Sequence, residues 1–225
     1  MIRGLILLAA IGGIAAAARG QMTGSIRRDT APIDVPDGRS TGDAARAISD
    51  NFALCIVKRH YPQVLKTLAG PQDAMHDYKF LPKLMDAECF TGSASVGRSY
   101  GTSDVELNTN PVSFRGALYK ALVRKDFSRR PGTMGAAPLE ITGDNAPIHR
   151  FADCVVRADP ADTLKLVLAT AGTDAEPAAI GALRPHLEQC TPTGEQMAFS
   201  KGNLIGYLAE AYFREADASK STGAN

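Results

Sequence analysis

The chain lacks most of the features that mark nucleic-acid-binding proteins and enzymes. It has no tryptophan, aromatic residues make up only 6% of its 225 residues, and 25 Lys and Arg stand against 24 Asp and Glu. A nucleic-acid surface normally brings a strong basic excess, so this balance argues against a nucleic-acid partner. With 44% apolar and 22% charged residues, the composition is that of a folded protein.

Motifs for catalysis and for metal binding are also missing. The four histidines, His60, His76, His149 and His186, form neither H-x-x-x-H nor H-E-x-x-H. No serine stands in G-x-S-x-G, no cysteines have the C-x-x-C spacing of zinc or redox sites, and the carboxylates are scattered. We therefore predict no catalytic, cofactor-binding or metal-binding residue and no cofactor. These absences favour a protein that is not an enzyme.

The N-terminus has an apolar run that is too short to cross a membrane. Gly4–Ala18 spans 15 uncharged residues, follows Arg3 and closes on Ala16-Ala17-Ala18. A membrane-spanning helix needs about 20 apolar residues, and a small-x-small ending is typical of a cleaved signal. We expect a signal peptide at residues 1–18, whose removal leaves 24 charges of each sign, and a periplasmic or secreted protein without a stable membrane span. An uncleaved anchor is the alternative.

The body of the chain repeats itself. Three segments recur in the same order: Phe52–Lys58 in Phe151–Arg157, Leu81–Cys89 in Leu183–Cys190, and Phe114–Arg124 in Leu204–Arg214. Chance rarely preserves such an order, so we infer a duplicated module. In the first copy, Gly92–Asn110 is a polar, glycine-rich insertion, which predicts an exposed loop.

The apolar period within each copy is helical. Ala45, Ile48, Phe52 and Cys55 share one seam, for example, while alternating segments such as Met197–Phe199 and Val105–Leu107 are short. The expected fold is mainly α, with two tandem, similar small helical units and at most short β-ribbon elements. The predicted organisation is a signal peptide (1–18), a flexible leader (19–42), helical unit 1 (43–130), a linker (131–145), helical unit 2 (146–218) and a disordered tail (219–225).

Four cysteines in an exported chain permit three disulfide pairings. The duplication selects Cys55 with Cys89 and Cys154 with Cys190, separated by 34 and 36 residues, so that each unit carries its own bridge. With so few aromatic residues each unit has little core, which such bridges offset. Two matched glycines, Gly116 and Gly206, stand inside helical patterns, where they predict a close approach of helices or a ligand groove.

The arrangement resembles uncharacterised exported bacterial proteins that carry one or two modules of the type F-x-x-C-V-V, C, then L-[RK]-G-A-L-x-x-A-L-[VY]-R. The residues that carry this resemblance are Phe52, Cys55, Val57, Cys89 and Phe114–Arg124, and again Phe151, Cys154, Val156, Cys190 and Leu204–Arg214. The second copy departs at Ile205 and Tyr207, where the first has Arg115 and Ala117. The resemblance implies export and the duplicated organisation, and it implies no activity.

Together these features favour a binding or structural interaction protein of the cell envelope, with an envelope or extracellular protein as its partner. That hypothesis predicts a surface patch of apolar or basic residues shared by both units; the densest basic cluster is Arg124–Arg130. The alternatives are a hydrolase acting on an envelope component, with its site between the units or under Gly92–Asn110, and a small-ligand carrier with a groove between helices. A compact pocket joining His or carboxylate groups from both units would favour the hydrolase.

Overall fold

The computed structural model describes residues 41–69, 84–99, 111–135, 138, 140–142, 145–192 and 197–222. Within these ranges the regular structure is entirely helical, as expected. The helices are α1 (Thr41–Arg59), α2 (Tyr61–Leu68), α4 (Ala87–Ser99), α5 (Pro111–Phe127), α6 (Ala146–Ala158), α7 (Pro160–Leu168), α8 (Ala175–Cys190) and α9 (Lys201–Thr222). Met197–Phe199 is not a strand. The other ribbon candidate, Val105–Leu107, lies outside the described residues.

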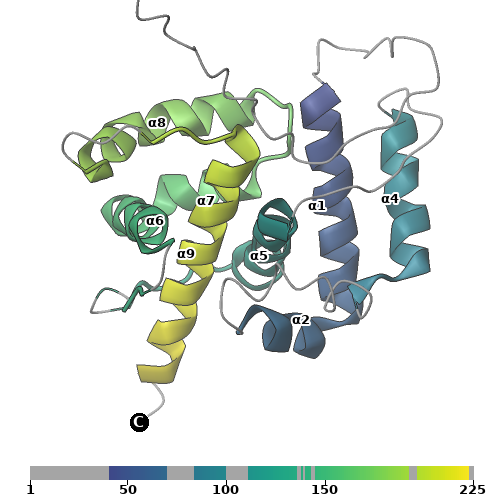
Figure 1. The fold of residues 1–225 in the computed structure, drawn as a ribbon, viewed down its shortest axis with the longest axis horizontal. Coiled ribbons are helices and arrows are strands. Elements are labelled where there is room, and N and C mark those ends of the chain that lie inside the picture. Colours follow the sequence, from purple (N-terminus) through teal and green to yellow (C-terminus); the bar gives the residue numbers. More distant parts are fainter. Residues whose placement is uncertain are drawn as a thin grey trace, which may run out of the picture.

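The helices form two similar halves. In each half a cysteine-bearing helix (α1 or α6) is followed by a short helix (α2 or α7), a helix with the second cysteine (α4 or α8) and a long helix with a central glycine (α5 or α9). The first half lies to the right in Figure 1, and α6 to α8 lie to the left. Helices α5 and α9 meet between them, so the last helix of each half forms the junction.

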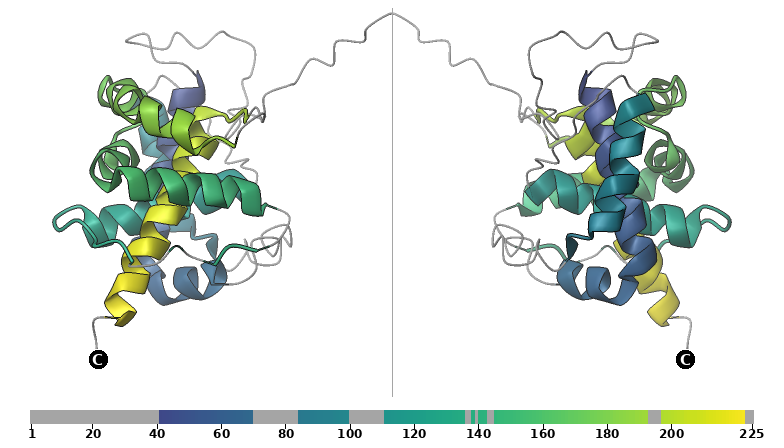
Figure 2. Two further views of the ribbon diagram at one scale, coloured as in Figure 1. Left: turned by 90° about the vertical axis from the view of Figure 1, so that its left-hand side faces the viewer. Right: turned by 90° about the vertical axis from the view of Figure 1, so that its right-hand side faces the viewer.

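The two halves share one hydrophobic core. Phe52 and Leu118 of the first half belong to the same buried cluster as Val156 and Leu208 of the second. Aromatic rings cross the junction too: Phe127 of α5 lies 5.8 Å from Tyr212 and 6.1 Å from Phe213 of α9, centroid to centroid. The left panel of Figure 2 shows the outer face with α6 and α8 toward the viewer. The right panel shows the opposite face, with α1 and α4 toward the viewer.

Both predicted disulfides are present. Cys55 of α1 is bonded to Cys89 of α4, and Cys154 of α6 is bonded to Cys190 of α8. The second cysteine of each bridge has a different position in its helix. Cys89 lies in the first turn of α4, whereas Cys190 is the last residue of α8. The Asp86 carboxylate accepts from the backbone N–H groups of Glu88 and Cys89 and starts a new helix there.

Several helix boundaries have a cause in the local sequence. Asp159 is the N-cap of α7, since its carboxylate accepts from the N–H of Asp162 at 2.9 Å, and Pro160 follows in the first turn. The Ser200 hydroxyl accepts from the N–H of Asn203 at the start of α9. Helix α5 begins at Pro111, as the sequence indicates.

Three segment predictions need correction. Gly92–Ser99 is not an exposed loop, because it continues α4 and buries Ser93, whose hydroxyl donates to the Cys89 carbonyl; residues 100–110 lie outside the described residues. The predicted disordered tail from residue 219 is wrong for residues 219–222, because α9 extends through Thr222. Helix α1 begins at Thr41, two residues inside the predicted leader.

The predicted linker, residues 131–145, contains no helix over its described residues. Hydrogen bonds nevertheless hold it against the second half. The N–H of Gly132 donates to the Tyr212 hydroxyl at 3.1 Å, and the N–H of Gly135 donates to the Glu215 carboxylate at 3.1 Å. Arg157 donates to the Gly135 carbonyl at 3.2 Å. These bonds hold the segment against α6 and α9.

A search of the described helices for one long and apolar enough to cross a membrane found none.

Candidate functional site

Gly116 of α5 and Gly206 of α9 face each other where the two halves cross. A Cβ placed on Gly116 would lie 2.7 Å from the Cα of Gly206, and one placed on Gly206 would lie 2.9 Å from the Cα of Gly116. The helices therefore touch backbone to backbone, which any larger residue would prevent. This confirms the predicted close approach and shows that the partner of each glycine is its counterpart in the other half.

A small pocket of about 30 Å³, open to solvent, lies on one side of this crossing. We call it the crossing pocket. Its polar lining comes from both halves and consists of Arg115, Asn145, His149, Asn203, Tyr207 and Glu210. Pro111, Val112 and the two crossing glycines complete it. The glycines make the pocket possible, because side chains at their positions would push α5 and α9 apart.

A buried ion pair dominates the electrostatics of the crossing pocket. Arg115 donates two hydrogen bonds to the Glu210 carboxylate, from Nε to Oε2 at 3.0 Å and from Nη2 to Oε1 at 2.8 Å. Arg115 Nη2 also lies 3.2 Å from the Tyr119 hydroxyl and 3.3 Å from the Leu68 carbonyl. Arg115 is 7% exposed and Glu210 is 2% exposed, so the pair is shielded from water.

One side-chain nitrogen of Arg115 takes no part in these hydrogen bonds. Arg115 Nη1 is buried and has no hydrogen-bond partner among the described residues. Buried charged donors are normally satisfied, and an orphan costs free energy. Arg115 lines the crossing pocket, but this nitrogen is itself closed off from solvent, so the orphan donor belongs to the buried ion pair.

His149 and Tyr207 form the wall beside the ion pair. Their rings pack edge to face, 5.3 Å apart between centroids. Burial lowers the pKa of His149, so its imidazole is neutral near pH 7. Burial and the nearby Glu210 charge raise the pKa of Tyr207, so its hydroxyl stays protonated. Both side chains therefore offer neutral hydrogen-bonding groups.

The histidines singled out from sequence do not come together. His60 Nε2 lies 2.9 Å from Asp86 Oδ2, and Arg59 donates to the same oxygen at 2.8 Å. The contact with His60 holds the pKa of Asp86 well below its usual range, helped by the N–H of Cys89. His186 lies 3.9 Å from Asp159, and His76 lies outside the described residues. Only His149 lines the crossing pocket.

The basic cluster Arg124–Arg130 is divided between the interior and the surface. Arg124 donates to the Leu168 carbonyl at the end of α7 at 2.6 Å, and the Lys125 ammonium lies 4.0 Å from the centre of the Tyr61 ring. Arg129 and Arg130 are exposed. Two members of the cluster therefore tie elements together, as cations at a helix C-terminus commonly do.

A larger groove of about 250 Å³ lies between α1, α5 and the segment after α7. Its two cations are already engaged: Lys120 pairs with Asp50 at 2.6 Å, and Arg124 binds the Leu168 carbonyl. The crossing pocket has the larger set of polar side chains and is the stronger candidate site.

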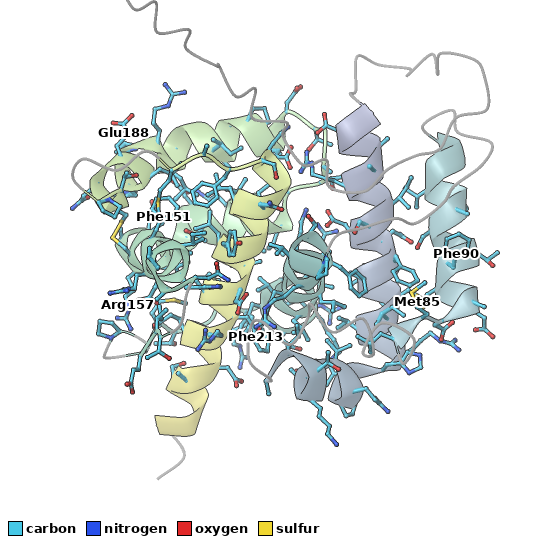
Figure 3. All side chains as sticks on the ribbon, in the orientation of Figure 1. Met85, Phe90, Phe151, Arg157, Glu188 and Phe213 are labelled. Carbon is cyan, nitrogen blue, oxygen red and sulfur yellow. A yellow bond between two sulfur atoms is a disulfide. The ribbon has the colours of Figure 1, made fainter. Side chains whose placement is uncertain are left out.

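A buried carboxyl pair on α6 and α9 has no counterpart in the first half and was missed by sequence reasoning. Asp153 and Glu215 lie together beside Arg157, which reaches Glu215 at 2.7 Å and Asp153 at 3.5 Å. Figure 3 shows Arg157 on α6, next to α9. Burial, together with the hydrogen bond and charge of Glu215, raises the pKa of Asp153 to about 6. No sequence signal marks the pair, because 62 residues separate its members.

A second ionic cluster joins the N-terminal ends of α1, α8 and α9. The buried Glu176 carboxylate accepts from Arg46 through both oxygens, and from Lys201 at 3.0 Å. Burial alone would raise the pKa of Glu176, but these two cations outweigh it and lower the pKa. The cluster holds the halves together and leaves Glu176 no free oxygen.

Comparisons with known proteins found no match: no protein family, no curated protein and no solved structure matches the chain. Among the described residues, no group of three or more His, Cys, Asp or Glu is placed to hold a metal ion. The two disulfides indicate an oxidising compartment.

Proposed function

We propose that this protein is an exported binding protein, periplasmic or secreted after cleavage of residues 1–18, and that the crossing pocket is where it binds a small molecule. The observation that carries this proposal is the pocket itself, which is open to solvent, joins both halves and is lined by six polar side chains beside the crossing glycines. Polar groups that converge on one concave site are typical of small-molecule binding.

The composition of the pocket favours binding over hydrolysis. Its described lining contains no Ser, Thr, Cys or Lys that could attack a substrate covalently. The pocket joins both halves, but the first half contributes Arg115, while the imidazole and the carboxylate both come from the second. Glu210 is held by Arg115 through both oxygens, which suits a structural partner better than a general base.

The His60–Asp86 pair offers a hydrolase no better site. Asp86 Oδ1 accepts from two backbone N–H groups at the start of α4, and its other oxygen binds both His60 and Arg59. This carboxylate is committed to fixing α4 next to the Cys55–Cys89 bridge. We assign the pair a structural role.

A large apolar docking face receives less support than the pocket. Among the described residues, Met85 is the only large hydrophobic side chain that is exposed, and Figure 3 shows it beside the lower end of α4. Interfaces between proteins usually have a contiguous apolar centre. A protein partner in the envelope would therefore contact a mainly polar surface.

Native mass spectrometry of the protein isolated from the exported fraction tests the proposal. We expect a small-molecule adduct that disappears in His149→Leu, which alters the pocket wall. The matched control is His186→Leu, because His186 lies on α8 outside the pocket and its replacement should leave the adduct in place. Equal loss in both variants, or no adduct together with no thermal stabilisation by a metabolite panel, would contradict the proposal.

The export half of the proposal has its own measurement. The intact mass of the exported protein under non-reducing conditions should correspond to a chain that begins at Arg19 and has lost four hydrogens to two disulfides. A mass that retains residues 1–18 would show an uncleaved anchor.

A further inference from the structure

We infer that residues 131–135, which we call the strap, form a pH-sensitive latch over the buried carboxyl groups of Asp153 and Glu215. The strap is closed while the two carboxyls share one proton, and it opens when that proton passes to the solvent. This inference concerns the segment that follows α5 and is independent of the crossing pocket.

The strap reaches the carboxyl pair through its backbone. The Gly135 N–H donates to Glu215 Oε2 at 3.1 Å, and the Gly135 carbonyl accepts from Arg157 Nη1 at 3.2 Å. Arg157 Nη2 donates to the same Glu215 oxygen at 2.7 Å. One residue of the strap is therefore bonded both to the carboxylate and to its counter-ion, so a change of charge in this group acts directly on the strap.

The two carboxyls need a proton when the strap is closed. Asp153 is 6% exposed and Glu215 is fully buried. Asp153 Oδ1 and Glu215 Oε1 receive no hydrogen bond from any described donor when both carboxyls are ionised. A proton on Asp153 supplies the missing donor, because the two side chains are close enough to hydrogen-bond to each other. It also removes one of two like charges from a buried site.

The surrounding charges do not replace that proton. Those that act on Asp153 are Glu215 and Arg214 of α9 and Arg157 of its own helix, and the strap has no charged side chain. Arg157 already pairs with Glu215, and Arg214 lies 4.0 Å from Glu210. Burial and the contact with Glu215 outweigh both arginines and raise the pKa of Asp153 to about 6.

The strap is the part of this cluster that can move. It contains no helix, and its five residues are exposed or half-buried. Helices α6 and α9, in contrast, contribute Val156 and Tyr212 to the shared core, and the Cys154–Cys190 bridge ties α6 to α8. Local opening involves segments with few buried contacts. Release of Gly135 lets water reach the ionised carboxyls, which relieves the cost of burying their charge and leaves the core intact.

Amide hydrogen exchange of the ¹⁵N-labelled, disulfide-bonded protein tests the inference. The probe is the Gly135 amide, and Gly206, inside α9 at the crossing, is the core reference. Rates are corrected for the intrinsic pH dependence of exchange. The protection of Gly135 should fall about thirtyfold between pH 4 and 6 and level off above pH 7, because Asp153 regains its ordinary pKa of 3.8 in the open form.

Low urea separates opening of the strap from unfolding of the whole protein. Adding about 1 M urea should accelerate exchange at Gly206 and leave Gly135 nearly unchanged, since a local opening exposes little surface. If Gly135 and Gly206 were equally protected at every pH and urea concentration, the strap would open only with the whole protein, and the inference would be wrong. Protection of Gly135 that did not change with pH would also overturn it.

A substitution identifies the group that holds the strap. Asp153→Asn keeps a donor for Glu215 and cannot ionise, so the protection of Gly135 should no longer depend on pH. The matched control is Glu188→Gln, at an exposed position on α8, which should keep the wild-type decline. A wild-type decline in Asp153→Asn would contradict the latch. The wild-type comparison of Gly135 with Gly206 requires neither variant, so it decides the question even if Asp153→Asn does not fold.

Discussion

Gly116 and Gly206, 90 residues apart in the chain, touch backbone to backbone at the centre of the molecule. They occupy equivalent positions in the two similar halves, so each half supplies one of the two glycines at this crossing. The pocket beside them exists because both residues lack a side chain.

Gly116→Ala should destabilise the protein by about 1–3 kcal/mol, because the added methyl group would meet backbone atoms that cannot rotate away. Gly181→Ala, in the exposed part of α8, has nothing within 4 Å of the new methyl group and should be neutral or stabilising by about 1 kcal/mol. Urea unfolding measures both changes. If the two variants were equally stable, the helices would not be in the contact described.

Replacing Cys154 and Cys190 by serine should lower the free energy of unfolding by about 4 kcal/mol, since the bridge closes a loop of about 36 residues. The same change at Cys55 and Cys89 should have a similar cost, because that separation is 34 residues. Because the core is shared, each variant should still unfold in a single transition that tryptic protection and circular dichroism report together. Two separate transitions would show instead that the halves fold independently.

Stability should fall as the pH rises from about 4 to 6, because of the buried Asp153. Its pKa is raised from 3.8 in the unfolded chain to about 6 in the folded protein by burial and by Glu215. Between these two pH values the Asp153 carboxyl is protonated in the folded protein and ionised in the unfolded chain. The contribution of this proton to the free energy of unfolding is therefore complete at low pH and is lost as folded Asp153 ionises. Arg157 and Arg214 moderate the effect without reversing it.

The neutral variant Asp153→Asn should remove this decline, which chemical denaturation at several pH values would detect. Asp174→Asn, at an exposed position, should keep the wild-type pH dependence. An unchanged curve in Asp153→Asn would place the titrating group elsewhere.

Glu176→Gln should destabilise the protein by about 1.5–3 kcal/mol, because it removes one of the two carboxylates that pair with the buried Arg46 and leaves only Asp43. The matched control is Lys165→Gln, which breaks an ion pair whose lysine is 72% exposed and should cost less than about 1 kcal/mol. Thermal unfolding at low and high salt checks the comparison, since salt screens the exposed pair more strongly. A small effect of Glu176→Gln would mean that Lys201 and Arg46 are already well solvated.

Much of the local structure follows from short stretches of sequence. The 3.6-residue period around Phe52 and Phe151, the Asp159-Pro160 cap and the helix start at Pro111 depend on neighbours within a turn or two, so they can be read from the chain. The disulfide pairing is also determined, since the duplication assigns one cysteine pair to each half. Prediction failed at Gly92–Ser99, where small polar residues indicated a loop although burial of Ser93 and capping by Asp86 favour a helix.

The functional arrangement was decided by tertiary structure alone. Glu210 reaches Arg115 across 95 positions, and Glu176 reaches Arg46 across 130, distances at which no local period or motif carries information. The scarcity of aromatic residues suggested two small cores, each needing a bridge. Packing instead merges the halves into one core, because two amphipathic units bury more apolar surface together than either does alone. The crossing pocket and the buried Arg115–Glu210 pair are a consequence of that merger, and neither half contains them alone.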